Sequence, residues 1–247
     1  MKITGNTILI TGATSGIGLA FAEEFSRLGN IVIICGRREE RLDKIKQQHP
    51  SLVTKVVDVS NASQCNELAD WATKNFPELN VVINNAGVQF AFDLNKPVDM
   101  EKVNTEVQTN FIAPIQLSSL FVKHLSGKAN AAIINISSGL AFVPIAFMPV
   151  YCATKAAIHS FTVSLRYQLR KSNIKVFEVA PPSVDTELGH DRREDKSQSH
   201  GGMPIHTFLS EAVKAIEDDI YEAPIADAKH LKDKGMDMFE IMNGRFN

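Results

Sequence analysis

The chain has 247 residues, of which 44% are hydrophobic and 22% charged, with a formal net charge of −2. This is the composition of an ordinary globular protein, and the slight negative charge argues against non-specific binding to nucleic acid or to an anionic membrane surface. The first residues show no signal-peptide pattern, and the longest mostly apolar run, 139–150, is too short for a membrane span. We therefore expect no nucleic-acid partner and no membrane attachment.

Cysteines and histidines are scattered along the chain. The three cysteines have no CxxC spacing, and the seven histidines form no HExxH motif. This pattern favours neither a disulfide framework nor a metal site. The sequence therefore predicts no bound metal and a reducing, cytoplasmic location.

Short, β-branched apolar runs alternate with longer segments of helical period. The runs predict strands at 7–11, 31–35, 52–57, 81–84, 131–137 and 175–180. The longer segments predict helices at 17–29, 39–48, 62–75, 100–124 and 153–171. Strands that are apolar on both faces and separated by helices indicate a parallel sheet covered on both sides. We expect an α/β fold with a single domain over 1–247, a Rossmann-like doubly wound sheet.

A polar segment with a double glycine, 189–202, follows the last predicted strand. It is either a solvated loop or a mobile flap over a site.

Glycines gather where the first strand ends, in ILITGATSGIG. Gly12, Gly16 and Gly18 have no side chains, so the backbone is accessible where a predicted helix begins. The N-terminus of a helix is a favourable binding place for a phosphate group. The G-x-G-x-x-G spacing and the Walker A motif are both absent. The alternative is a tight turn with close helix–sheet packing and no ligand.

Three motifs in order resemble the short-chain dehydrogenase/reductase family. They are T-G-A-T-S-G-I-G at 11–18, N-N-A-G at 84–87 and Y-C-A-T-K at 151–155, and the resemblance extends to about Leu188. One departure is Pro182, in A-P-P-S-V-D-T, where the family usually has glycine. This variant, with the K-I-T-G-N-T start and the I-I-C-G-R-R-E turn, resembles the DltE-type branch.

The resemblance implies which residues bind a dinucleotide. They are Gly12, Thr14, Ser15, Gly16, Ile17, Gly18, Asp58, Val59, Asn85, Ala86, Gly87, Tyr151, Lys155, Pro181, Val184 and Thr186. Asn84 is expected mainly to brace the sheet. Asp58 faces the adenine in the family; the competing interpretation is that it caps the helix that follows it, and its two acceptor oxygens would allow both roles.

The second strand ends without the acidic residue that usually selects NAD(H). Gly36 takes that position, and Arg37 and Arg38 follow. Guanidinium groups there would bind a 2′-phosphate, so we expect NADP(H) rather than NAD(H), with Arg37 first and Arg38 second. The alternative is that these arginines belong only to the solvated start of a helix.

Tyr151 and Lys155 lie four residues apart, on one helix face. An ammonium nearby favours the ionised form of a tyrosine. Ser138, thirteen residues upstream, stands at the family's interval for a serine that holds the substrate oxygen. Asn110 matches the family's active-site asparagine, which distorts a helix and anchors a water. Its alternative is a buried asparagine bonded locally.

Together these residues predict an oxidoreductase that transfers hydride between NADP(H) and a carbonyl or alcohol substrate. Several residues suggest that the substrate is apolar, unless they serve as core or subunit contacts: Gln89, Phe90, Phe92, Leu140, Phe142 and Val143. The resemblance also implies a homodimer or homotetramer. The competing hypothesis is a catalytically idle, nucleotide-binding regulatory or scaffolding protein.

Overall fold

The computed structural model describes residues 1–188 and 201–244. Within them, parallel strands form one seven-stranded sheet in the order β3-β2-β1-β4-β5-β6-β7. The strands are β1 (Thr7–Thr11), β2 (Ile31–Gly36), β3 (Val53–Val56), β4 (Leu79–Asn84), β5 (Ala132–Ile136), β6 (Lys175–Ala180) and β7 (Glu222–Pro224). The first six confirm the predicted strands, and β7 is an addition that the sequence pattern does not predict.

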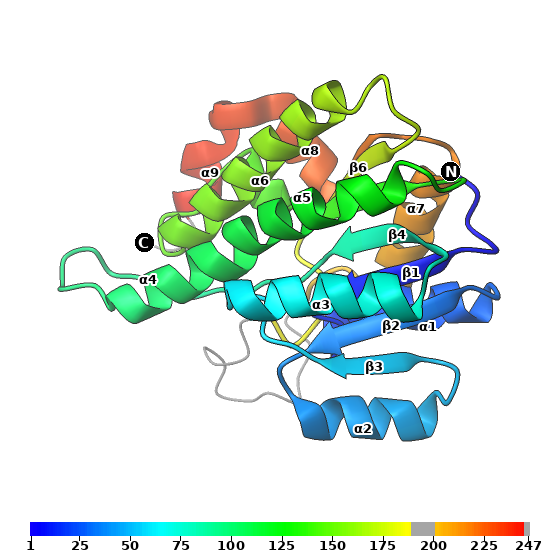
Figure 1. Ribbon diagram of the computed structural model, residues 1–247. Coiled ribbons are helices and arrows are strands. Elements are labelled where there is room, and N and C mark those ends of the chain that lie inside the picture. Colours follow the sequence, from blue (N-terminus) through cyan, green and yellow to red (C-terminus); the bar gives the residue numbers. More distant parts are fainter. Residues whose placement is uncertain (189–200, 245–247) are drawn as a thin grey trace.

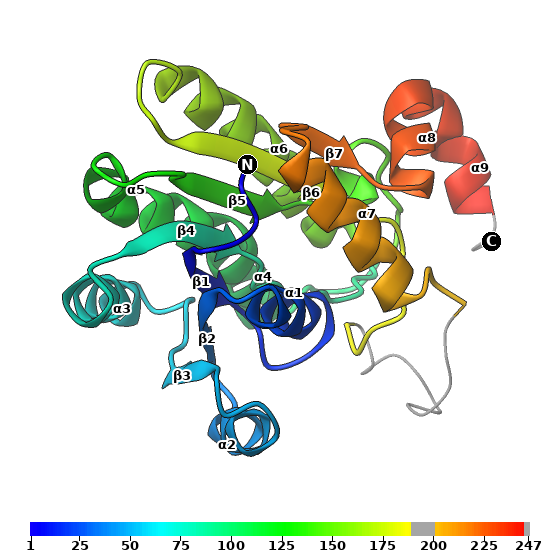
Figure 2. The ribbon, with the colours of Figure 1, turned by 90° about the vertical axis from the view of Figure 1, so that its right-hand side faces the viewer.

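Helices cover both faces of this sheet, as the sequence predicts (Figures 1 and 2). The α-helices are α1 (Gly16–Arg27), α2 (Glu39–Gln48), α3 (Ala62–Asn75), α4 (Met100–Val107), α5 (Ala113–Leu125), α6 (Pro149–Gln168), α7 (Ile205–Glu217), α8 (Asp227–Lys234) and α9 (Phe239–Asn243). The shorter turns are the π-helical η1 (Gln108–Ile112) and the 3₁₀ turns η2 (Gly139–Ala141) and η4 (Gly235–Met238). Figure 2 shows α3, α5 and α6 on one side of the sheet and α1 and α7 on the other.

The central strand β1 is buried on both faces. Ile8 and Ile10 pack into the apolar cluster that includes Phe208 of α7, whereas Leu9 packs into the cluster that includes Phe121 of α5. Side chains of this size contribute about 1.5–3 kcal/mol each when fully buried. This burial holds the carboxyl end of β1 beside that of β4. The strand order reverses between these two strands, and open α/β sheets bind ligands at such a point.

The largest differences between predicted and observed helix boundaries lie in two segments. The segment 100–124, predicted as one helix, is divided into α4 and α5 by the π-helical turn η1. The helix predicted to begin at 153 begins at Pro149, because proline fits the first turn of a helix, where its missing N–H is not needed. Tyr151 therefore lies in the first turn of α6.

The predicted polar segment 189–202 falls almost entirely outside the described residues, which resume at Gly201. Among the helices that the structure describes, none is both long and apolar enough to cross a membrane.

Candidate active site

The sequence-predicted site residues collect at one edge of the sheet. Gly12 follows β1, Arg37 follows β2, Asp58 follows β3, Asn85 follows β4 and Ser138 follows β5. Because the strands are parallel, their carboxyl ends all meet at this edge.

The glycine loop between β1 and α1 depends on residues without side chains. Gly12 and Gly16 have φ values of +66° and +56°, in the left-handed region that favours glycine. A Cβ at Gly18 would lie 2.4 Å from Nδ2 of Asn85 and 2.8 Å from the Gly12 oxygen. Ser15, the N-cap residue of α1, makes no side-chain hydrogen bond to the first turn. The loop therefore fits a phosphate group, which the first-turn N–H groups would bind.

Hydrogen bonds join this loop to the segment after β4. The Thr11 hydroxyl oxygen accepts from the backbone nitrogens of Asn85 and Ala86, each at 3.1 Å. The Asn85 side chain donates back to the Thr11 oxygen at 2.9 Å. One residue earlier, the Asn84 amide donates to Oδ1 of Asn135 on β5 at 2.8 Å, which is the bracing role expected of it.

The two predicted phosphate-binding arginines lie in different surroundings. Arg38 crosses to the glycine loop, where its Nη2 donates to Oγ1 of Thr14 at 2.6 Å and to Oγ of Ser15 at 3.0 Å. Arg37 points toward Asp58, with 4.0 Å between Nη1 and Oδ2. Arg38, rather than Arg37, therefore donates hydrogen bonds to the predicted nucleotide-binding loop.

Gly36 has no room for a side chain, because a Cβ there would lie 2.6 Å from Cγ2 of Thr14. Close by, the Glu187 carboxylate pairs with Arg41 and, at 3.5 Å, with Arg38. Burial lowers the pKa of Arg38, the neighbouring Arg41 acts in the same direction, and Glu187 opposes both. The surface formed by Gly36, Arg37, Arg38 and Arg41 is therefore positively charged, and the Glu187 carboxylate lies against it.

Asp58 does not cap α3. Its Oδ1 accepts from the backbone nitrogen and the hydroxyl of Ser60, at 2.9 and 2.7 Å. Asn61 is the N-cap residue and accepts from two backbone nitrogens of the first turn. The capping alternative for Asp58 is therefore wrong. Val59 packs in the apolar core beside α3, and Ile17 packs against the core on the α1 side.

Tyr151, Lys155 and Ser138 lie where α6 meets the end of β5. Tyr151 is 6% exposed and Lys155 4%. The Lys155 ammonium is 5.6 Å from the centroid of the Tyr151 ring and donates to the Ile136 oxygen at 2.9 Å. Ser138 follows two residues after Ile136, and its hydroxyl oxygen accepts from the backbone nitrogen of Leu140 at 3.1 Å.

Burial is the main influence on Lys155. Removal from water disfavours the ammonium and lowers the pKa of Lys155 to about 8, although the carboxylates of Glu178 and Glu106 oppose the change. Lys155 is thus a cation that releases its proton far more readily than an exposed lysine.

Asn110 lies in the π-helical turn η1 and is almost fully buried. Its Oδ1 accepts from the Val88 nitrogen at 2.8 Å, and its Nδ2 donates to the Val88 oxygen at 2.8 Å and to Oγ1 of Thr154 at 3.2 Å. A Cβ at Gly87 would lie 3.6 Å from Oδ1 of Asn110 and 3.8 Å from Nζ of Lys155. The predicted distortion of the helix is present, and Gly87 brings the two side chains to one place.

The segment after β6 closes over the glycine loop despite its second proline. The Pro181 oxygen accepts from the first residue of η2 at 2.8 Å, so Pro182 does not prevent contact with the end of β5. Val184 forms a parallel bridge with the chain before α7. Thr186 lies against Gly16: a Cβ added at Gly16 would be 3.3 Å from the Cβ of Thr186.

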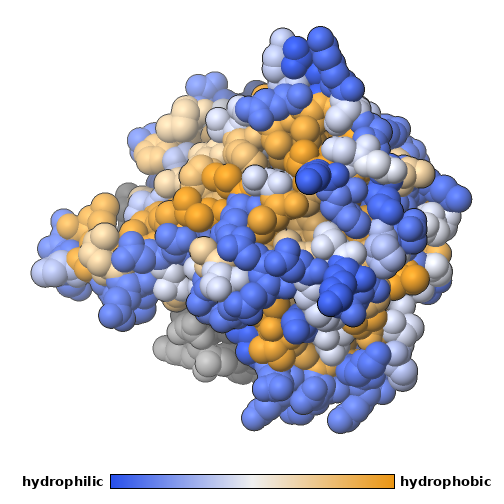
Figure 3. Space-filling view, in the orientation of Figure 1, coloured by the Kyte–Doolittle hydropathy of each residue, from blue (hydrophilic) through white to orange (hydrophobic). Residues whose placement is uncertain are grey.

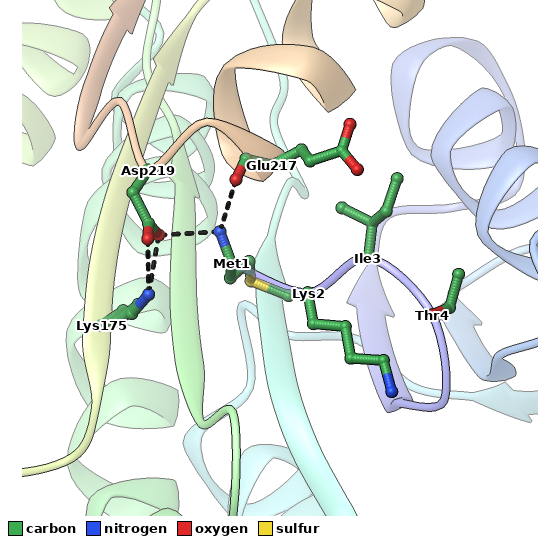
Figure 4. A pocket seen from close by; sticks show the side chains of 7 residues that line it. All are labelled: Met1, Lys2, Ile3, Thr4, Lys175, Glu217 and Asp219. Atoms are coloured by element: carbon green, nitrogen blue, oxygen red, sulfur yellow. Dashed lines mark hydrogen bonds and ion pairs between the residues drawn. The ribbon is translucent and has the colours of Figure 1, made fainter.

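A cavity of 460 Å³ lies elsewhere, at the amino ends of the strands (Figure 4). The Asp219 carboxylate there pairs with the backbone nitrogen of Met1 and with the Lys175 ammonium, each at 2.7 Å. None of the predicted site residues lines this cavity.

Several residues that hold this site together are not predicted from the sequence. The Thr11 hydroxyl could have been noticed as a polar group ending a buried strand. Thr154 and Glu187 offer no such signal, because their partners, Asn110 and Arg38, are remote in the sequence.

Comparisons with known proteins agree with this arrangement. The model of the short chain dehydrogenase family matches residues 6–197. The uncharacterized oxidoreductase DltE of Bacillus subtilis (strain 168) is 43% identical over 252 residues, which cover 100% of both chains.

Two solved structures have the same fold. A short chain dehydrogenase from Burkholderia cenocepacia J2315 in complex with NADP has a TM-score of 0.81 and 25% identity, covering 95% of this chain and 94% of that one. A short chain dehydrogenase/reductase from Burkholderia phymatum in complex with NAD has a TM-score of 0.78 and 24% identity, covering 90% and 89%.

Proposed function

The chain belongs to the short chain dehydrogenase family and, within it, to the DltE type, and from this membership we propose that it transfers hydride between NADP(H) and a carbonyl or alcohol substrate. The observation that carries the proposal is that Lys155 lies beside the Tyr151 ring and bonds to the end of β5, just before Ser138, while Gly87 brings Asn110 close to Lys155. A catalytically idle binding protein would have no need of this arrangement.

The chemistry follows from what each side chain can do. When bound, the nicotinamide supplies or accepts the hydride. In reduction the Tyr151 hydroxyl gives its proton to the carbonyl oxygen, which the Ser138 hydroxyl orients. The Lys155 ammonium stabilises the phenolate that Tyr151 leaves behind. Asn110 positions the Val88 backbone and thus the wall of the site. Oxidation of an alcohol is the reverse.

The preference for NADP(H) rests on the corner formed by Gly36, Arg37 and Arg38. A carboxylate at position 36, which would favour NAD(H), would collide with Thr14. Arg38 already donates to Thr14 and Ser15, and a 2′-phosphate there would accept from its guanidinium in place of Glu187. We therefore assign the leading role to Arg38 and the supporting one to Arg37.

The substrate is proposed to be largely apolar. Leu140 and Phe147, both partly buried, pack against the cluster that contains Tyr151. Two other candidates do not contribute in the same way. Val143 is fully buried in the protein, and Phe142 packs edge-on against His159 with 5.2 Å between ring centroids. Fewer of the predicted apolar side chains are therefore proposed to contact the substrate.

We further propose a homo-oligomer in the cytoplasm. Apolar side chains are exposed on η1, α5 and α6, and Figure 3 shows apolar surface over these helices. They are Ile112, Leu120, Val163 and Tyr167, between 36% and 67% exposed. Analytical ultracentrifugation tests the proposal, because replacing Leu120 by arginine should then convert the oligomer to monomers.

A screen for NADPH consumption over aldehydes and ketones tests the enzymatic proposal. Wild type should turn over at least one apolar carbonyl compound, and Tyr151→Phe should be inactive while it still binds NADPH. Tyr221→Phe, at a partly exposed tyrosine outside α6, is the matched control and should keep full activity. If wild type and Tyr151→Phe bind NADPH and are equally inert, the idle binding protein is the correct alternative.

A further inference from the structure

A second group of side chains gathers behind the candidate active site, on α6, β6 and β7. His159, Glu178 and Glu222 each offer a ligand atom, and these atoms all lie within 4.8 Å of one another. Nδ1 of His159 is 2.8 Å from Oε2 of Glu178. Glu178 and Glu222 are register partners on neighbouring parallel strands, so their side chains extend from the same face of the sheet.

One carboxylate of this group is buried and only partly paired. Glu178 is fully buried, and its Oε1 has no hydrogen-bond partner within residues 1–188 and 201–244. A buried carboxylate is costly unless it is paired, and like charges directly opposite on adjacent strands repel. Lys232 pairs with Glu222 at 2.6 Å, His159 in its protonated form pairs with Oε2 of Glu178, and the Lys155 ammonium interacts with the Glu178 charge. A divalent ion that replaced the His159 proton and the Lys232 ammonium would keep the charges balanced and would give Oε1 of Glu178 a partner.

We propose that His159, Glu178 and Glu222 bind a divalent transition-metal ion, with Zn²⁺ as the best match. An imidazole nitrogen and two carboxylate oxygens are ligands that Zn²⁺ accepts, with water completing a tetrahedron. Mg²⁺ and Ca²⁺ favour oxygen ligands alone. The two carboxylates balance the two charges of the ion, and the otherwise unpartnered oxygen of Glu178 becomes a ligand.

Two small changes would open the site. The hydrogen between His159 and Glu178 must leave Nδ1, so that the neutral imidazole can present a lone pair to the metal. The Lys232 side chain, 39% exposed near the end of α8, must turn outward from Glu222. Lys232 therefore acts as the competing cation, and its removal should strengthen metal binding.

Such an ion would connect the C-terminal part of the chain to the catalytic helix. His159 is one turn beyond Lys155 on α6, and Glu222 belongs to the strand that leads into α8. Helix α8 in turn contacts η2, the turn after Ser138, since a Cβ at Gly139 would lie 3.0 Å from the Cβ of Ala228. The metal would therefore stabilise the backing of the active site without touching substrate.

Zinc binding to the full chain tests this proposal. Protein stripped with a chelator and exchanged into buffer is titrated with ZnCl₂ against a chromophoric chelator, and its melting temperature is followed. We expect one tight Zn²⁺ per chain and a rise in melting temperature. His159→Gln and Glu178→Gln should each weaken binding at least tenfold, as expected for a lost ligand. Lys232→Met should strengthen it.

Matched surface variants separate this site from adventitious binding. His206→Gln and Glu211→Gln alter exposed residues of α7 and should leave the tight zinc unchanged. Should Glu178→Gln fail to fold, His159→Gln and Lys232→Met decide the question. The proposal is overturned if wild type takes up no tight zinc, or if His159→Gln binds it as wild type does. The group would then be an ion network that Lys232 completes.

Discussion

The side chain of Asn110 pairs with the backbone of Val88 in both directions, with Oδ1 accepting from the Val88 nitrogen and Nδ2 donating to the Val88 oxygen, each at 2.8 Å. This pairing holds the loop after β4 against the π-helical turn. It gives the backbone polar groups of Val88 partners that no other described side chain is seen to supply.

Asn110→Ala should damage activity more than stability. Losing the buried hydrogen bonds should lower the free energy of unfolding by about 1–3 kcal/mol. Displacement of the site wall should lower kcat/KM by roughly a hundredfold. Asn104→Ala, on the exposed surface of α4, is the control and should change neither quantity. Wild-type kcat/KM in Asn110→Ala, measured beside its denaturation curve, would contradict the positioning role.

The pKa of Lys155 predicts how activity depends on pH. Burial disfavours the ammonium and brings this pKa down from 10.5 to about 8, so Lys155 becomes neutral above that pH. Since the ammonium supports the phenolate, kcat/KM should fall as pH rises through about 8. The Glu178 carboxylate raises the pKa of Lys155, so Glu178→Gln should move this fall to lower pH.

Both pH profiles should be recorded with a chelator present, so that metal content is constant. Glu211→Gln removes an equivalent charge from the exposed face of α7 and should leave the profile in place. An unmoved profile in Glu178→Gln would mean that the alkaline fall belongs to another group.

The position of Arg38 predicts an asymmetry between the two arginines. Arg38→Ala should raise the Kd for NADPH roughly tenfold to a hundredfold and leave the Kd for NADH nearly unchanged, because a charged hydrogen bond contributes about 1.5–3 kcal/mol. Arg37→Ala should have a smaller effect. Arg27→Ala removes the same charge from the far end of α1 and is the control. Equal affinities of wild type for NADPH and NADH would be evidence against a 2′-phosphate site.

Gly18→Ala should be poorly tolerated. The added methyl group would overlap the Asn85 amide and the Gly12 oxygen, so we expect a loss of about 1–3 kcal/mol in unfolding free energy and weaker nucleotide binding. Gly127→Ala offers a matched comparison, because nothing lies within 4 Å of its Cβ position and its φ is not positive. Thermal denaturation with and without NADPH measures both effects, and equal stability of the two variants would contradict the steric account.

Local patterns predict the sheet well because its central strands are buried on both faces. The runs 31–35 and 131–137 are short, apolar and rich in β-branched residues, as buried strands are, and both pair as predicted. The strand β7 escapes prediction because E-A-P has neither length nor periodicity. The helix predicted over 100–124 is broken at η1, where the Asn110 side chain bonds with Val88, a contact that helical periodicity does not reveal.

In the candidate site, too, positions within one strand or one helix are predictable from the sequence, whereas contacts between distant segments are not. The motifs predict Ser138 near the end of β5 and Tyr151 and Lys155 near the start of α6, and these positions follow from one strand and one helix; in the structure Ser138 lies two residues after β5. Which arginine meets the glycine loop depends on side-chain direction after β2, and sequence order does not settle it. The grouping of His159 with Glu222 depends on the pairing of β6 with β7, which spacing along the chain cannot show.

The hydrogen bonds between Thr11 and the segment after β4 join parts of the chain that are 74 and 75 residues apart. The glycine loop is only one part of the predicted nucleotide site, and the other part, Asn85 to Gly87, follows β4. We therefore expect nucleotide binding to report that these two parts of the chain have come together. A fluorescence signal from bound NADPH could time the last step of refolding, after secondary structure has already formed.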